Sequence, residues 1–247
     1  AENDREVLNL LKPVLNKYYN REIKEVRREN GVYHLSYHSK YFVDFFLNLG
    51  LKAVDGDQKT VPESIFTAPK EAVVGFLQGL FTADGTVNYD PKHSVANIRL
   101  TSQSMQLLKD VRLLLLNCAI KSGIYNRSRK ERLLFPYTTK SGEKRMYKSD
   151  GRCYEIIISR DNILAFNQEI GFIGKKHTSR IEILNQRKYE PAVFSEKIKS
   201  IISIGQKEVF DLAEPLTHSF IANGICIHNC GEQPLGPYDS CNLGSIN

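Results

Sequence analysis

Three consecutive residues near the end of this 247-residue chain carry side chains that suit one reaction. His228, Asn229 and Cys230 lie within the segment GICIHNCGEQPLG, residues 224–236. A side-chain amide can attack its own backbone carbonyl to form a five-membered succinimide, so Asn229 can break the bond to Cys230 without water. A neighbouring histidine can protonate the departing peptide group, and a cysteine thiolate is a strong nucleophile. The triplet is therefore suited to breaking its own peptide bond.

A second candidate for chemistry is Asp84, which lies near the end of the segment LQGLFTADG, residues 77–85. Gly79 and Ala83 are four residues apart, so they share one face of a helix and let a second helix approach closely. Two such helices would bring two carboxylates together, and paired carboxylates can hold Mg²⁺ for phosphodiester hydrolysis. An ordinary helix end at Asp84 is the alternative interpretation, and the repeat and the basic segment described next favour the functional one.

Positive charge gathers in residues 121–148, which hold nine lysines and arginines against Glu131 and Glu143, a local charge of +7 in a chain of net charge +6. One interpretation of this segment is a solvated hairpin. The other is a basic β-ribbon that neutralises phosphates and enters the major groove of double-stranded DNA. The second interpretation assigns DNA contacts to Arg127, Arg129, Lys130, Arg132, Lys144 and Arg145.

An internal repeat indicates the elements that must position these residues. The segment VYHLSYHSKYFVDFFLNLGL (32–51) aligns with CYEIIISRDNILAFNQEIGF (153–172) at an offset of 121 residues. Each copy is predicted to be a strand followed by a helix that ends at a glycine in the left-handed conformation. The identical pairs are Tyr33 with Tyr154, Phe45 with Phe166 and Gly50 with Gly171.

The second copy is predicted to be complete and the first to be shortened. From Glu71 to Phe172 we expect helix 71–83, strands at 86–89 and 95–101, helix 104–117, the basic strand pair and helix 161–170, in the order αββαββα. The first copy is expected to hold a helix at 2–17 and a hairpin around Asn30 and Gly31. The offset places its counterpart of Leu77 before residue 1. We therefore expect either a fragment of a longer reading frame, which the surviving half repeat favours, or a homodimer of half sites.

The segment LQGLFTADG resembles the nine-residue signature of the LAGLIDADG homing endonucleases. It matches at Leu77, Gly79, Leu80, Ala83, Asp84 and Gly85, and departs from it at Gln78, Phe81 and Thr82. The resemblance implies hydrolysis of double-stranded DNA, with Asp84 as a ligand of Mg²⁺. The segment KTVP, residues 59–62, is similar to a lysine-containing segment of the endonucleases found within inteins. This implies that Lys59 is a cation near the scissile phosphate, with Lys175 or Lys176 as its counterpart.

The segment VFDLAEPLTHSFIANGICIHNC, residues 209–230, resembles the C-terminal splicing region of inteins. The resemblance implies an all-β segment of the Hedgehog/intein type. It places Asp211 and His218 at the two upstream catalytic positions and His228 at the penultimate position. Asn229 is then the last intein residue, and Cys230 is the first residue of the host protein and the nucleophile of the transfer step.

The following segment CGEQPLGPYDSCNLGSIN, residues 230–247, resembles the active-site region of the large subunit of ribonucleotide reductase, most closely the adenosylcobalamin-dependent class. The resemblance implies that Cys230 carries a thiyl radical, that Glu232 transfers a proton and that Cys241 is one of two cysteines that reduce the ribonucleotide. Adenosylcobalamin would be bound by the complete host enzyme and not by this fragment.

Composition excludes several other classes of protein. Apolar segments are short and interrupted by charge, and the start AENDREVLNLLKPVL lacks the pattern of a signal peptide, so we expect a cytoplasmic protein without a membrane partner. The five cysteines are odd in number and lack paired ligand spacing, which predicts neither a disulfide framework nor a zinc site.

The sequence predicts an α+β endonuclease part followed by an all-β splicing segment, within a gene for ribonucleotide reductase. The alternatives are a DNA-binding module that has lost its nuclease activity, or a product regarded simply as an oxidoreductase. The missing N-terminal part of the intein and reductase is an expected partner. The expected boundaries are 1–58 for the shortened repeat, 59–173 for the complete repeat, 174–197 for a linker, 198–229 for the splicing segment and 230–247 for the reductase segment.

Overall fold

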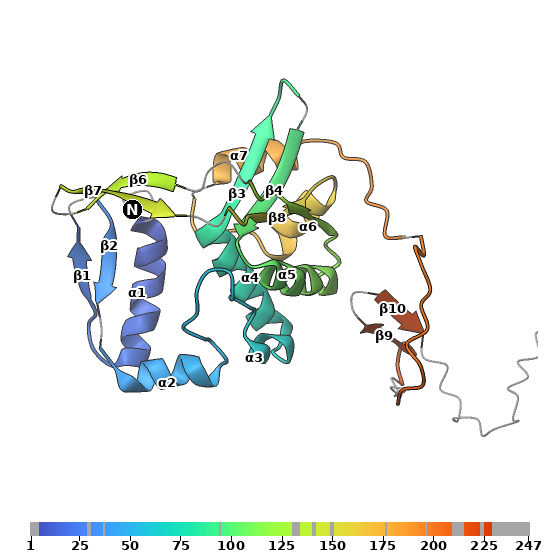
Figure 1. Cartoon of the computed structure of the whole chain (residues 1–247), viewed down its shortest axis with the longest axis horizontal. Helices are drawn as coiled ribbons and strands as arrows, with labels where there is room; N and C mark the ends of the chain where they lie inside the picture. The colour runs from blue at the N-terminus through green and yellow to red at the C-terminus, as the bar shows by residue number, and fades with distance from the viewer. Residues whose placement is uncertain are drawn as a thin grey trace, which may run out of the picture. The chain divides into compact units, whose positions relative to one another are not determined.

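The computed structural model describes residues 5–28, 31–36, 38–93, 95–129, 134–139, 142–148, 151–175, 177–195, 197–208, 215–222 and 225–228. The chain divides between Phe194 and Ser195 into two units. Helices α1 to α7 and strands β1 to β8 belong to the first unit, and strands β9 and β10 belong to the second (Figure 1). Within the described residues, no helix is long and apolar enough to span a bilayer.

A four-stranded antiparallel sheet forms the centre of the first unit. Its order is β3 (Gly85–Asp90), β4 (Val95–Ser102), β8 (Tyr154–Ile158) and β5 (Ser122–Asn126). Along β4, the buried residues Ile98 and Leu100 alternate with Arg99 and Thr101, which are half-buried and exposed. The period of two means that one face of the sheet is apolar and the other is polar.

Four helices supply the other half of the core against the apolar face of the sheet. They are α4 (Lys70–Asp84), α5 (Met105–Asn117), α6 (Asn162–Glu169) and α7 (Thr178–Asn185), and each contributes buried residues to the same cluster. In this cluster the Phe81 ring of α4 meets the Phe166 ring of α6 edge-on, with centroids 4.8 Å apart. The helices therefore cover one face of the sheet only.

The strand–helix repeat is confirmed by the structure. In the first copy, β2 (Tyr33–Ser36) is followed by α2 (Lys40–Asn48), and β8 and α6 take the same places in the second. Gly50 and Gly171 follow the ends of the two helices with φ of +88° and +64°, both in the left-handed region. The two copies differ in packing, because Phe45 is 54% exposed whereas its counterpart Phe166 is fully buried.

The prediction of a single basic ribbon over residues 121–148 is wrong. Strand β5 belongs to the central sheet, where Ile124 pairs with Ile156 of β8 and packs against the core. The remaining residues include a separate two-stranded hairpin of β6 (Leu134–Thr138) and β7 (Lys144–Lys148). The apolar Ile124 draws β5 into the core sheet, so the second strand pair of the αββαββα order is β5 with β8.

The first part of the chain forms a small helix–hairpin arrangement. Helix α1 (Arg5–Tyr19) precedes the hairpin of β1 (Lys24–Arg27) and β2, and residues 2–4 of the predicted first helix lie outside the described residues. Lys12 of α1 donates to the carboxylate of Glu25 on β1 (3.0 Å), and this hydrogen bond holds the pKa of Glu25 below its usual value. Glu6 of α1 also accepts a hydrogen bond from the backbone N–H of Lys175 (2.9 Å).

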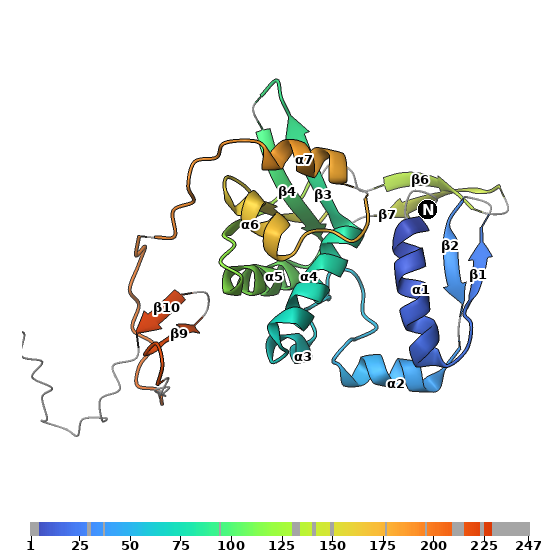
Figure 2. The ribbon, with the colours of Figure 1, turned by 180° about the vertical axis from the view of Figure 1, so that it is seen from behind.

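The segment 174–197, expected as a linker, contains helix α7. Leu184 of this helix is fully buried in the core, and Arg180 donates to the backbone carbonyl of Val87 on β3 (2.8 Å). Figure 2 shows α7 lying across the strands of the central sheet. This segment is therefore part of the folded first unit as far as Phe194.

The second unit contains an antiparallel hairpin of β9 (Ser219–Ala222) and β10 (Ile225–His228). Cys226 lies in β10 opposite Ile221 and is exposed. The strand pair itself lies where the sequence predicts the closing β segment.

Candidate functional site

Lys59 and Asp84 line one hollow of about 310 Å³ at the end of helix α4. Lys59 lies in the connection that leads to the short helix α3 (Glu63–Phe66), and Asp84 is the last residue of α4. Thr101, on the polar face of β4, lines the same hollow. The two side chains that the sequence singles out are thus brought together beside the open face of the sheet. The remaining lining residues are Gly56, Leu80, Leu100, Ser102, Gln103 and Leu107.

The end of α4 fixes the position of Asp84. Leu77 and Phe81 are buried, which anchors the last turns of the helix in the core. Gly85 follows at once as the first residue of β3, and a Cβ atom there would collide with the carbonyl oxygen of Phe81. Only glycine permits this close approach. The direct passage from helix to strand therefore places Asp84 at the rim of the hollow.

Two polar side chains of the following helix hold the backbone around Lys59. Ser104, the N-cap of α5, donates to the carbonyl oxygen of Lys59 (2.6 Å) and is almost fully buried. The buried Asp110 accepts a hydrogen bond from the N–H of Val61 (3.2 Å). Sequence reasoning did not find these two residues. The capping sequence SMQLL predicts a cap at Ser104, but it does not predict the contact with Lys59 across 45 residues.

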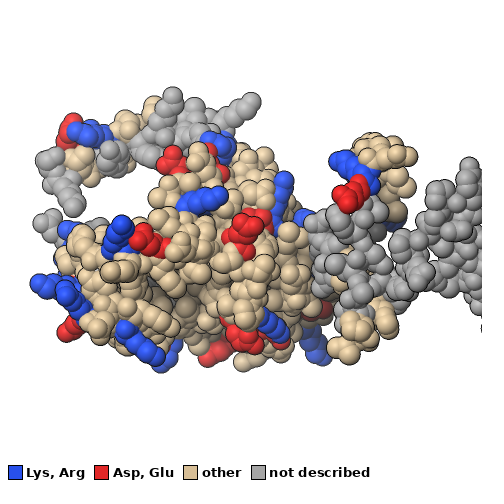
Figure 3. All heavy atoms as spheres, turned by 90° about the horizontal axis from the view of Figure 1, so that it is seen from below, with Lys and Arg blue, Asp and Glu red and all other residues tan. Residues whose placement is uncertain are grey.

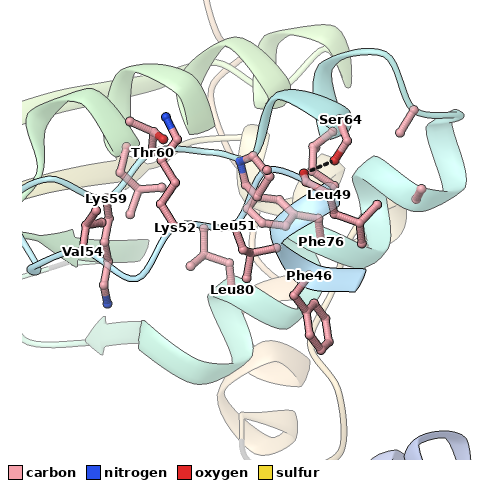
Figure 4. Close-up of a pocket in the computed structure, with 16 residues that line it drawn as sticks. Phe46, Leu49, Leu51, Lys52, Val54, Lys59, Thr60, Ser64, Phe76 and Leu80 are labelled. Carbon is pink, nitrogen blue, oxygen red and sulfur yellow. Dashed lines mark hydrogen bonds between the residues drawn. The ribbon is translucent and has the colours of Figure 1, made fainter. Parts of the chain in front are cut away.

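An apolar cavity of about 630 Å³ lies beside this hollow (Figure 4). It is lined by Phe46 and Leu49 at the end of α2, and by Phe76 and Leu80 of α4. Ser64 of α3 donates to the carbonyl oxygen of Leu49 (2.6 Å), which joins the end of α2 to α3. Leu80 and Lys59 line both spaces, so the apolar cavity adjoins the polar hollow along one side of α4.

The side of α4 that the sequence assigns to a second helix is open in the structure. A Cβ atom at Gly75 or at Gly79 would meet no heavy atom within 4 Å, and Ala83 is exposed. Among the described residues that line the hollow, Asp84 is the one carboxylate. The described residues also contain no group of three or more histidines, cysteines or acids close enough to hold a metal ion together. Asp84 is therefore the one member of the expected carboxylate pair among the described residues of the hollow.

The residues of the hollow suit one part of a Mg²⁺ site. Mg²⁺ is commonly bound by one or two carboxylates, with water and substrate phosphate oxygens completing its shell. The Asp84 carboxylate and the side-chain oxygens of Thr101, Ser102 and Gln103 are hard oxygen donors. The donor set therefore fits Mg²⁺, with Asp84 as the charged ligand.

Polar and basic residues lie on the open face of the sheet. Arg99 of β4 and Arg127, which follows β5, each contact a carboxylate oxygen of Glu155 on β8 (both 3.3 Å). Arg129 continues this edge, because its N–H donates to the carbonyl oxygen of Gly151 (3.1 Å). The chain thus places Arg127 and Arg129 at the edge of the central sheet.

Lys144 and Arg145 lie apart from that edge, on the hairpin of β6 and β7. Arg145 contacts Glu143 (2.9 Å), and both side chains are more than half exposed. Lys130 and Arg132 lie outside the described residues. The face shown in Figure 3 carries basic and acidic side chains interspersed, so it shows no continuous block of positive charge.

In the second unit, strand pairing brings together the backbone positions of two predicted splicing residues, His218 and His228. His228 ends β10 and pairs in register with Ser219, the residue that follows His218. His218 is exposed and has a left-handed φ of +51°. The two histidines therefore occupy neighbouring positions at the same end of the hairpin. Asp211, Asn229, Cys230, Glu232 and Cys241 lie outside the described residues.

The chain is similar to large proteins of different activities. It is 33% identical over 208 residues to the ribonucleoside-diphosphate reductase NrdEB subunit alpha of Bacillus subtilis, covering 76% of this chain and 19% of that protein. It is 27% identical over 240 residues to a DNA polymerase of Thermococcus sp. GE8, covering 93% of this chain and 12% of that protein. The chain thus spans less than a fifth of the length of these relatives.

Among solved structures, the chain is similar to variants of the homing endonuclease I-DmoI. One, a crystal structure in complex with its target DNA in the presence of Mg, has a TM-score of 0.44 and 21% identity, and the match covers 69% of this chain and 75% of that chain. Residues 71–171 match the family described as the LAGLIDADG-like domain. This span begins in α4, includes the whole central sheet and ends after α6. Residues 71–171 of this chain are therefore similar to the LAGLIDADG-like domain.

Proposed function

We propose that residues 59–173 are the DNA-binding and DNA-cleaving half of a homing endonuclease carried by an intein. One observation carries this proposal: Lys59 and Asp84 line the same hollow, which adjoins the open face of the sheet. An acid and a base of this kind, next to a polar surface with Arg99 and Arg127, suit a phosphodiester substrate. The substrate is double-stranded DNA lying along the open face.

In this mechanism each residue has a distinct task. The arginines beside the sheet neutralise backbone phosphates and hold the duplex over the hollow. Lys59 lies near the scissile phosphate and stabilises the negative charge that develops on its oxygens. Asp84 would hold Mg²⁺, and the bound ion would supply Lewis-acid chemistry for the attacking water and the leaving oxygen. Ser104 and Asp110 keep the backbone around Lys59 in place.

A partner for Asp84 is part of the proposal. The open side of α4, with Gly75 and Gly79, would receive a second helix of the same kind, which brings a second carboxylate to the hollow. That helix would come from another segment of the proposed intein or from a second copy of this chain. The alternative function, a DNA-binding module that does not cut, is favoured by the single carboxylate among the described lining residues.

The range of relatives supports an intein. A reductase and a polymerase catalyse unrelated reactions, yet each matches this chain over a small part of its length. A shared segment of this kind cannot supply the chemistry of both proteins, and a self-excising insertion explains its presence in both. We therefore assign Asn229 as the cyclising residue, with His218, His228 and Asp211 assisting and Cys230 as the nucleophile.

The host would be a ribonucleotide reductase that uses adenosylcobalamin. In this proposal Cys230 becomes the radical-bearing cysteine after splicing, Glu232 transfers a proton and Cys241 reduces the ribonucleotide. These steps require the complete host enzyme, in which residues 230–247 supply one part of the active site.

A nicking assay tests the endonuclease proposal. Purified chain is incubated with supercoiled plasmid carrying a ribonucleotide reductase gene without the insertion, with and without Mg²⁺. We expect binding in both conditions and slow nicking only with Mg²⁺. Asp84→Asn and Lys59→Ala should abolish nicking and leave binding within about two-fold, because each removes a catalytic group and not the binding surface.

Lys52→Ala is the matched control, since Lys52 lines the apolar cavity and not the hollow of Asp84. It should nick at the rate of the unaltered chain. Binding without any Mg²⁺-dependent nicking would support the DNA-binding module, and nicking that persists in Asp84→Asn would refute the assignment of Asp84.

A further inference from the structure

Glu155 of β8 lies between Arg99 of β4 and Arg127, which follows β5, on the open face of the sheet. Its Oε1 is 3.3 Å from Nη1 of Arg99, and its Oε2 is 3.3 Å from Nε of Arg127. Each carboxylate oxygen therefore has its own guanidinium partner. The three residues form a cluster with a net charge of +1, which we call the Arg–Glu–Arg cluster.

The exposure of the cluster is graded. The side chain of Glu155 is 11% exposed, whereas those of Arg99 and Arg127 are 32% and 53% exposed. The carboxylate thus lies beneath the guanidinium groups, which reach the surface. A duplex on this face would meet the two arginines before it meets the acid.

Both arginines are also held from a second side. Arg99 donates from Nε to the Oδ1 of Asn97 (2.6 Å) on the same strand. The Arg127 guanidinium carbon lies 5.4 Å from the centre of the Tyr125 ring. A guanidinium has five N–H donors, so each arginine keeps donors for a ligand after these contacts are made.

Glu155 orders the side chains of Arg99 and Arg127, and it does not attract DNA. A carboxylate on a DNA-facing surface repels phosphate, so Glu155 weakens the general affinity for DNA. However, an unrestrained arginine loses much side-chain freedom when it binds, and fixing it beforehand lowers that entropic penalty. A buried acid that fixes two arginines therefore favours ligands that match their geometry.

The geometry of the cluster suits bases that are close together. Because both guanidiniums contact one carboxylate, they lie within about three base-pair steps of 3.4 Å along a duplex. A fixed, forked guanidinium is the preferred partner of the O6 and N7 atoms of guanine in the major groove. Two guanidinium groups that are held in place therefore match two closely spaced guanines.

We propose that Glu155 is a positioning residue that orders Arg99 and Arg127 for reading two closely spaced guanines in the major groove. This inference rests on the proposed binding of DNA by the open face of the sheet. It assigns part of the sequence preference to the core of the LAGLIDADG-like domain, in addition to the general phosphate attraction of the basic residues.

Selection from a duplex library tests the proposal. The unaltered chain is bound to 30-base-pair duplexes with a randomised centre, and recovered sequences are compared with the input. We expect a pair of guanines within three base pairs of each other. In competition, replacing either guanine by adenine should weaken binding by at least about five-fold.

Two glutamine variants and two lysine variants distinguish the positioning role of Glu155 from the effect of its negative charge. Glu155→Gln and Glu143→Gln remove one negative charge each, but Glu143 contacts Arg145 on the exposed hairpin and not the cluster. Both should raise general affinity at low salt, and only Glu155→Gln should reduce discrimination at both guanines to less than about two-fold. Arg99→Lys and Arg127→Lys keep the charge and remove the fork, so each should abolish discrimination at one guanine.

Thermal unfolding of Glu155→Gln shows whether this variant is folded. If it is not folded, the discrimination measured with Arg99→Lys and Arg127→Lys decides whether the proposal holds. Discrimination that survives in a folded Glu155→Gln, or in both lysine variants, would overturn the inference while leaving DNA binding intact. A selection without guanine pairs would also overturn it. No binding to any duplex would refute the proposed function together with this inference.

Discussion

Gly79 and Gly85 lie six residues apart at the end of α4, and a methyl group meets opposite surroundings at the two positions. At Gly85 a Cβ atom would collide with the carbonyl of Phe81, whereas at Gly79 it would enter open space. The sequence motif treats both as small residues. The structure shows that one is required by the turn from helix to strand and the other leaves a helix face open.

The Gly85→Ala variant should therefore be destabilised, by about 1–3 kcal/mol in the free energy of unfolding, because the new methyl group forces the backbone apart. Gly79→Ala should stabilise the chain by about 0.5–1 kcal/mol, because alanine favours the helix interior. Urea unfolding followed by far-ultraviolet circular dichroism measures both changes. Equal stabilities of the two variants would contradict the close approach at Gly85.

Cys118 provides a test of burial at a single residue. It caps the end of α5, and burial raises the pKa of its thiol above the usual value, despite an opposing effect of the charge on Lys70. Since the thiolate is the reactive form, alkylation of Cys118 should need a higher pH than alkylation of the exposed Cys226. Mass spectrometry of iodoacetamide adducts from pH 7 to 10 measures the two rates. A Cys118 that reacts first at pH 7 would show that this thiol is accessible and not buried.

The strands and helices show how far a sequence determines its elements. The helix ends at Gly50 and Gly171 were predictable because apolar spacing and a left-handed glycine are local signals. The pairing of β5 with β8 was not, because the hairpin of β6 and β7 separates the two strands along the chain. Helix α7 was missed because few of its residues besides Leu184 face the core. So few apolar positions do not show the period of a helix in the sequence.

The residues of the candidate site were also predictable only in part from the sequence. Asp84 and Lys59 were found from motifs, and the structure places them in one hollow. Ser104, Asp110 and Glu155 were not found, because each acts on residues far away along the chain. A local pattern does not show which distant backbone or side chain a polar group will contact.

The separation of β5 from the hairpin leads to a test of which element binds phosphates. Replacing Arg127 and Arg129 by alanine removes charge at the sheet edge, and replacing Lys144 and Arg145 removes it from β7. Each positive charge removed from the DNA-binding surface should lower the slope of log K against log salt by about 0.9, because fewer phosphates are neutralised. Fluorescence anisotropy with a duplex at several salt concentrations measures the slope. We expect a decrease of about 1.8 for each double variant, and an unchanged slope for the hairpin variant would identify it as a solvated element.

At the scale of the whole molecule, the two units permit a test of the proposed splicing junction by itself. Cyclisation of Asn229 needs its own amide and nearby acid–base groups, and it does not use the thiol of Cys230. We expect slow release of residues 230–247 from the purified chain, detected by mass spectrometry after prolonged incubation. Asn229→Ala should abolish this release, and His228→Ala should slow it.

Cys230→Ala serves as the control for this prediction, because the thiol belongs to the earlier transfer step and release should continue without it. If the Asn229→Ala chain still loses the same residues, ordinary proteolysis is the cause and the assignment of Asn229 is wrong.

The base of the β6–β7 hairpin is closed by backbone hydrogen bonds, from the N–H of Arg127 to the carbonyl of Cys153 (2.8 Å) and from that of Arg129 to Gly151 (3.1 Å). Within the described residues, strands β6 and β7 pair with each other and not with the strands of the central sheet. Its length and sequence can therefore change over generations without disturbing the register of β5 and β8. In the proposed endonuclease, DNA contacts made by the hairpin could therefore change while the hollow of Lys59 and Asp84 stays as it is.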